Sequence, residues 1–133
     1  MSALRFISTE TFTQSARALF VAALLTVTVF SIFSFDPTPN PGQSDKLKHF
    51  FAYAVLGLLA VASVPQTLSR FGAPWAVAVF ALGAWGVCLE LVQSTLPARE
   101  ASVYDAAANL IGAAGGAAGC IAAFSRLRRR MTA

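Results

Sequence analysis

Four long apolar stretches, separated by short polar breaks, dominate this chain of 133 residues. They cover residues 18–35, 50–64, 73–92 and 106–124, with Glu90 and Asn109 as conspicuous polar interruptions. A helix needs about 20 mostly apolar residues to cross the hydrocarbon of a bilayer. The second stretch reaches that length only if its helix begins near Lys46. We therefore predict an all-α membrane protein with a single domain (1–133), a compact bundle of about four transmembrane helices at residues 18–35, 46–64, 73–93 and 104–124.

The composition argues against a soluble domain. Only 12% of the residues are charged, whereas a soluble domain has about 25%, and the mean hydropathy is +0.65. A chain this small keeps a large share of its surface exposed, so this much apolar surface needs lipid around it. The basic residues lie between and beyond the apolar stretches and form no stripe on a polar face. We therefore predict no nucleic-acid partner.

The distribution of basic residues predicts the orientation in the membrane. Cytoplasmic segments of membrane proteins are enriched in Lys and Arg. With a cytoplasmic N-terminus and four spans, seven of the ten basic residues lie inside and three outside. We therefore predict that both termini are cytoplasmic. The inner group is Arg5, Arg17, Arg70, Arg126, Arg128, Arg129 and Arg130, and the outer group is Lys46, Lys48 and Arg99.

Most other polar residues of the apolar region gather on the outer side of this topology. Asp45, His49 and Tyr53 follow one another at intervals of four, so they share one face of the second helix. Ionisable groups within a membrane span are costly and usually face the bundle interior or water. We predict an outward-facing polar cluster made of Asp45, Lys46, His49, Tyr53, Glu90, Gln93, Arg99, Ser102, Asp105 and Asn109.

Several of these residues also have a purely structural interpretation. Ser102 and Asp105 match the S-x-x-D capping box that opens many helices. Glu90 is harder to explain in this way, because no capping pattern requires an acid there. One histidine and scattered carboxylates are a weak signal for a divalent ion on Asp45, Glu90 and Asp105. No metal and no cofactor is therefore predicted.

The fourth apolar stretch is rich in small residues. Gly112 and Gly116 form one GxxxG pattern, and Gly115 and Gly119 form a second. Small residues allow helices in lipid to approach closely. We predict that these glycines pack against other helices of the same bundle, and a face for an oligomer is the alternative.

Two spaced motifs resemble those of the VanZ-like family of small bacterial membrane proteins. The first is DKLKHFFAY at residues 45–53, and the second is E-x2-Q-x3-P-x-R-x2-S-x2-D-x3-N-x2-G at residues 90–112. The chain has Pro-Ala-Arg where the family often has Pro-Gly-Arg. The resemblance implies residence in the bacterial cytoplasmic (inner) membrane and a cell-envelope role. The family's namesake is linked to low-level resistance to the glycopeptide teicoplanin, but the resemblance implies no reaction and no substrate.

Three functions remain open at this level. The first is binding of a membrane lipid or a cell-envelope precursor, because helix N-termini and nearby basic side chains favour anionic groups. The second is an enzyme acting on a lipid-linked or headgroup substrate, with His49 as general base and Glu90 or Asp105 as its acid–base partner. The third is an assembly factor in which the cluster only fixes helix packing. We favour the first, and the sequence assigns no catalytic residue.

Overall fold

The structure is a computed structural model that describes residues 2–33, 43–64, 74–96 and 102–132. In the first two stretches it describes side chains from Glu10 and Lys46 onward. These residues form four helices, which are α1 (Ser2–Phe33), α2 (Gln43–Ala62), α3 (Pro74–Gln93) and α4 (Val103–Thr132).

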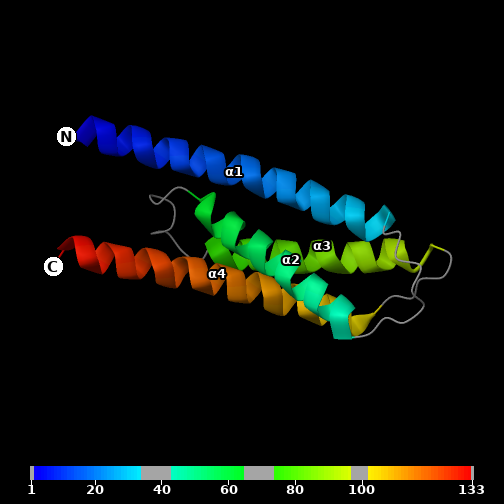
Figure 1. Cartoon of the computed structure of the whole chain (residues 1–133). Helices are drawn as coiled ribbons and strands as arrows, with labels where there is room; N and C mark the ends of the chain where they lie inside the picture. Colours follow the sequence, from blue (N-terminus) through cyan, green and yellow to red (C-terminus); the bar gives the residue numbers. More distant parts are fainter. Residues whose placement is uncertain (1, 34–42, 65–73, 97–101, 133) are drawn as a thin grey trace.

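The helices form a bundle in which successive helices run in opposite directions (Figure 1). α1 and α3 lead away from the end at which both termini lie, and α2 and α4 return to it. The ends of α1 and α3 and the starts of α2 and α4 therefore meet at the other end, which we call the polar end. Gln93 joins two helices there, because its side-chain amide donates a hydrogen bond of 2.7 Å to the backbone carbonyl of Ser31.

α2 and α3 lie close to their predicted bounds, but α1 and α4 are longer than predicted. α1 begins at Ser2 instead of residue 18, and α4 continues to Thr132 instead of ending at 124. An apolar stretch marks only the part of a helix that suits lipid. Residues 2–33 contain neither Gly nor Pro, and arginines are good helix formers that also favour a helix C-terminus. Both helices therefore continue through polar sequence.

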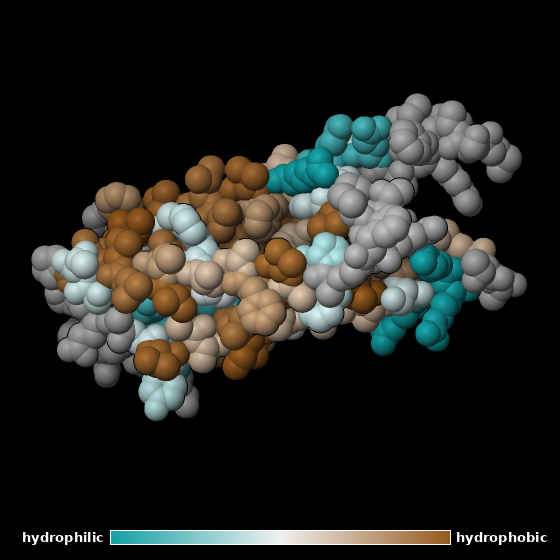
Figure 2. Space-filling model, turned by 180° about the vertical axis from the view of Figure 1, so that it is seen from behind, coloured by the Kyte–Doolittle hydropathy of each residue, from teal (hydrophilic) through white to brown (hydrophobic). Residues whose placement is uncertain are grey.

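Three of the helices are long and apolar enough to cross a membrane, at Glu10–Phe33, Pro74–Gln93 and Val103–Met131. Large apolar side chains cover their outer faces, and Phe30, for example, is 70% exposed. Figure 2 shows hydrophobic residues over the middle of one face and hydrophilic residues gathered towards the end that carries the termini. The chain is therefore a membrane protein. α2 is less apolar, since it carries three charged residues in its first two turns.

The most extensive contact in the bundle is between α2 and α4. It depends on glycines whose missing side chains let the two backbones touch. A Cβ atom added to Gly112 would collide with the carbonyl of Phe50, and one added to Gly116 would collide with the carbonyl of Ala54. Such close approach permits weak Cα–H···O contacts and dense packing. These interactions hold helices together in lipid, where the hydrophobic effect does not drive helix association.

The second glycine pair does not take part in this contact. A Cβ atom added to Gly115 or Gly119 would meet nothing within 4 Å. Only the pair formed by Gly112 and Gly116 therefore packs against another helix in the described part of the chain.

We predict that Gly116→Ala destabilises the protein and that Gly119→Ala does not. Both exchanges introduce a better helix former, by about 1 kcal/mol, but only the Cβ at position 116 meets the backbone of α2. Overpacking typically costs about 1–3 kcal/mol. In detergent, the melting temperature should therefore fall for Gly116→Ala and stay level or rise for Gly119→Ala. Equal melting temperatures for the two variants would contradict the close approach of α2 and α4.

Candidate functional site

The contact between α2 and α4 places His49 beside Asn109. Nδ1 of His49 lies 3.1 Å from Oδ1 of Asn109, and Asn109 is buried, with 1% exposure. An amide oxygen only accepts hydrogen bonds, so Nδ1 of the ring is the donor in this contact. The lone pair of the neutral ring is therefore on Nε2.

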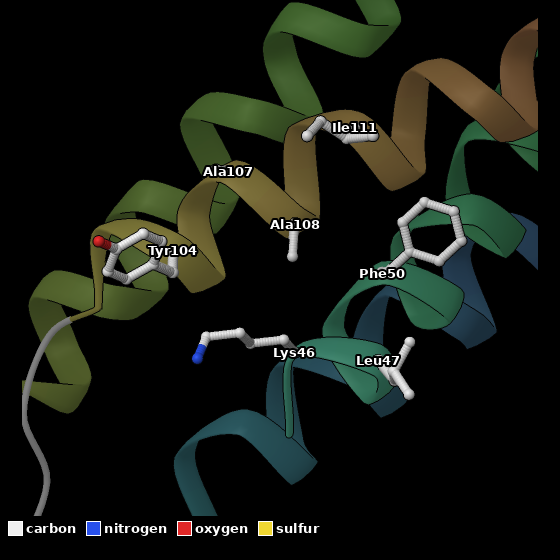
Figure 3. A pocket seen from close by; sticks show the side chains of 7 residues that line it. All are labelled: Lys46, Leu47, Phe50, Tyr104, Ala107, Ala108 and Ile111. Atoms are coloured by element: carbon white, nitrogen blue, oxygen red, sulfur yellow. The ribbon is translucent and has the colours of Figure 1, made fainter. Parts of the chain in front are cut away.

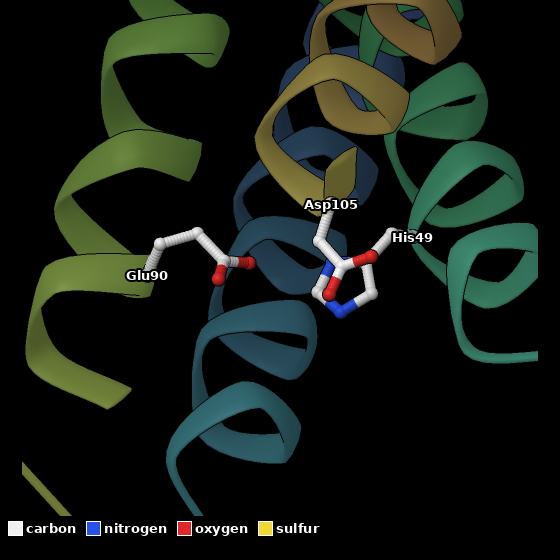
Figure 4. A group of neighbouring side chains, drawn as sticks. All are labelled: His49, Glu90 and Asp105. Atoms are coloured by element: carbon white, nitrogen blue, oxygen red, sulfur yellow. The ribbon is translucent and has the colours of Figure 1, made fainter. Parts of the chain in front are cut away.

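Glu90 from α3 and Asp105 from α4 complete a group that we call the His–acid cluster (His49, Glu90 and Asp105). One donor atom from each residue can be chosen so that all three lie within 4.8 Å of one another. Figure 4 shows the carboxylate of Glu90 pointing from α3 towards the other two side chains. Glu90 is buried, whereas His49 and Asp105 are partly exposed. Two negative carboxylates at this spacing repel each other, and a cation between them would relieve the repulsion.

Glu90 also has a structural contact that the sequence interpretation missed. Its Oε2 accepts a hydrogen bond of 3.0 Å from the backbone N–H of Ser102, just before α4 begins. Oγ of Ser102 in turn accepts a 3.3 Å hydrogen bond from the N–H of Asp105, as the capping motif predicts. The first N–H groups of a helix have no partner within it. Glu90 therefore takes part in capping the start of α4, although its side chain comes from α3 and not from the S-x-x-D capping box.

Tyr53 places a buried hydroxyl next to this group. It follows His49 by one turn of α2, is 1% exposed, and its hydroxyl has no hydrogen-bond partner among the described residues. A Cβ atom built on Gly86, one turn before Glu90, would lie 3.2 Å from this hydroxyl and 2.8 Å from the amide nitrogen of Asn109. The hydroxyl therefore lies between α3 and α4. Buried polar groups nearly always have a partner, so an unpaired one marks a place for water or a ligand.

A separate pocket opens between the first turns of α2 and α4 (Figure 3). The ammonium of Lys46 lies 5.5 Å from the centre of the Tyr104 ring, within cation–π distance. Tyr104 was not among the predicted site residues, although tyrosines are common at membrane–water interfaces. The rest of the pocket wall is apolar and consists of Leu47, Phe50, Ala107, Ala108 and Ile111.

The remaining predicted site residues lie elsewhere. Gln93 is buried but directs its amide to Ser31 of α1, so it joins helices and is not part of the His–acid cluster. Lys48 is exposed. Arg99 and the side chain of Asp45 lie outside the described residues. The structure thus brings together His49, Tyr53, Glu90, Ser102, Asp105 and Asn109, and it places Lys46 in the neighbouring pocket.

No family model, no curated protein and no solved structure matches this chain. The function must therefore be argued from the two features at the polar end, which are the His–acid cluster and the pocket at Lys46.

We predict that Glu90→Ala lowers the free energy of unfolding by about 1–3 kcal/mol, the usual cost of leaving a buried hydrogen-bonding group without its partner. Glu90→Gln should stay close to the unsubstituted protein, because its side-chain carbonyl can still accept from the N–H of Ser102. Thermal melting in detergent checks both, with the exposed Glu10→Ala as a control for loss of charge. If Gln and Ala at position 90 destabilise equally, the bond to Ser102 contributes nothing.

Proposed function

We propose that the chain is a VanZ-like protein of the bacterial inner membrane that binds an anionic lipid or a lipid-linked envelope precursor at its polar end. In this proposal all four helices cross the membrane, both termini are cytoplasmic and the polar end lies on the outer side. The length of α2 supports a fourth span, because its 20 residues correspond to about 30 Å, the thickness of the hydrocarbon core.

The charged start of α2 is compatible with this span. Lys46 and Lys48 lie in its first two turns, and long basic side chains near helix ends reach out to the headgroup region. A topology in which only α1, α3 and α4 cross the membrane is harder to reconcile with the bundle, since α1 and α3 run in the same direction (Figure 1). Two parallel spans need a return crossing between them, and the position of α2 between α1 and α3 in the chain supports α2 as that crossing.

The pocket at Lys46 is the observation that carries the proposed binding function. It combines one partly buried ammonium group with apolar walls that continue along α2 and α4 through Phe50 and Ile111. An amphiphile has the same division, with a charged headgroup next to a hydrocarbon chain. The N-termini of α2 and α4 lie at this end, and the positive ends of their dipoles favour an anion there.

A specific observation also favours the enzyme as a second candidate. In the neutral ring of His49 the lone pair is on Nε2, and the ring is held by Asn109 close to two carboxylates. A histidine held in this way can act as a general base, and a carboxylic acid beside it can return a proton to a leaving group. The substrate would then be a phosphate ester in a lipid headgroup, and the protein would convert the lipid instead of only retaining it.

We predict the orientation of the protein from labelling of single cysteines. Cys88 and Cys120 are first replaced by Ala, and then either the exposed Thr95→Cys or the exposed Met131→Cys is added. A membrane-impermeant maleimide should label Thr95→Cys in intact bacterial spheroplasts and Met131→Cys only after lysis. Labelling of both positions in intact cells, or of Met131→Cys alone, would overturn the proposed topology.

We predict that Lys46→Ala reduces retention of phosphatidylglycerol by the detergent-purified protein about fivefold, since a Lys near an anionic surface contributes about 1 kcal/mol. Native mass spectrometry measures the bound lipid, and retention of phosphatidylcholine should not change. Arg126→Ala, which removes the same charge at the opposite end, is the matched control.

Three results would change the interpretation. Equal losses in Lys46→Ala and Arg126→Ala would mean that attraction is diffuse and that the pocket is not a binding site. Conversion of phosphatidylglycerol by the unsubstituted protein, abolished by His49→Ala, would favour the enzyme. No selective retention by the unsubstituted protein would overturn the proposed lipid binding.

A further inference from the structure

We propose that His49, Glu90 and Asp105 form a binding site for a divalent metal ion. The site uses none of the residues that line the lipid pocket, so it goes beyond the proposed lipid binding and does not depend on it. Its three ligands come from three different helices, α2, α3 and α4, and an ion held by them would join those helices at the polar end.

The spacing of the donor atoms suits such an ion. All three lie within 4.8 Å of one another. Ligand atoms about 2.0–2.2 Å from a metal are at most about 4.4 Å apart. Small rotations of the Glu90 and Asp105 side chains, by less than about 1 Å at their oxygens, would therefore bring all three into a coordination shell.

Asn109 holds His49 in the form that a metal requires. The ring uses Nδ1 to donate to Oδ1 of Asn109, so the lone pair remains on Nε2. Histidine ligands of metals usually donate their second ring N–H to an oxygen, which fixes both the tautomer and the ring orientation. Glu90 is oriented in a similar way, because its Oε2 accepts a hydrogen bond from the N–H of Ser102.

The buried hydroxyl of Tyr53 is an independent indication. It has no partner among the described residues, although it is 1% exposed, and it lies next to Asn109. Buried polar atoms nearly always have a partner, and a water molecule bound to the ion would provide one here.

The charge of the cluster points the same way. Two carboxylates within 4.8 Å of each other, one of them buried, favour a divalent cation between them. Arg99 follows α3 in the sequence and is the competing source of positive charge, so the experiment must separate it from a metal.

The donor set indicates the class of metal. One imidazole nitrogen with two carboxylate oxygens suits first-row divalent ions such as Mn²⁺ or Zn²⁺. Mg²⁺ prefers a shell of oxygens, most of them from water or phosphate. Three protein ligands also leave at least one coordination position for water or for an oxygen of a bound anion.

The test uses Mn²⁺ as the probe, because thiols bind it weakly and Cys88 and Cys120 then do not interfere. The full chain, without a histidine tag, is purified in detergent, treated with EDTA, desalted and titrated. Free Mn²⁺ is measured by electron paramagnetic resonance. We expect one Mn²⁺ per chain, displacement by Zn²⁺, and at least tenfold weaker binding in both Glu90→Gln and Asp105→Asn. Glu10→Gln, which removes an exposed carboxylate of α1, should bind like the unsubstituted chain.

Melting curves in EDTA show whether each variant is folded, and His49→Gln replaces any variant that is not. Binding of clearly less than one Mn²⁺ per folded chain overturns the proposal, as does unchanged binding in Glu90→Gln and Asp105→Asn. Arg99→Gln tests whether the guanidinium of Arg99, and not a metal ion, compensates the two carboxylates. If it binds Mn²⁺ while the unsubstituted chain does not, the guanidinium occupies the cluster and the proposal is wrong. Phosphatidylglycerol retention in the same samples shows separately whether the lipid pocket functions.

Discussion

Gly112 and Gly116 let the backbone of α4 lie directly against α2, and this contact positions the groups of the polar end. A side chain at either position would collide with the backbone of α2, and the 3.1 Å contact between His49 and Asn109 joins the same two helices. In lipid, close packing of small residues has to replace the hydrophobic effect that drives association in water. The packing of two helices and the geometry of the candidate site therefore have the same cause.

Much of the helical architecture follows from the sequence, because apolar stretches and prolines determine where helices suited to lipid begin and end. The gathering of polar residues at one end also follows from alternating helix directions. The individual contacts do not follow. Whether Gln93 meets His49 or reaches Ser31 depends on how α3 is rotated in the bundle, and no repeat in the sequence encodes that rotation. The hydrogen bond between Glu90 and Ser102 connects α3 to the residue just before α4, so a motif within one helix cannot reveal it.

The polar end contains two electrostatic environments on neighbouring faces of the same two helices. The face with Lys46 and Tyr104 is cationic and lined by apolar side chains. The face with His49 and Asp105 turns towards Glu90 and is rich in acidic oxygens. Residues three or four positions apart share a face of a helix, and adjacent positions do not. On α4, Tyr104 and Asp105 are adjacent, so one step along this helix separates a surface that favours anions from one that favours cations.

The length of α4 has a consequence for the depth of these groups. Residues 105–126 measure about 31 Å at 1.5 Å per residue, close to the hydrocarbon thickness of about 30 Å. A bilayer of this thickness that has Arg126 at one surface would have Asp105 at the other. The depth of the first turn of α4 would therefore depend on the thickness of the bilayer. A thicker bilayer would place this turn within the hydrocarbon, and a thinner one would expose it to water. Solvent access to His49 would then vary with the lipid composition around the protein.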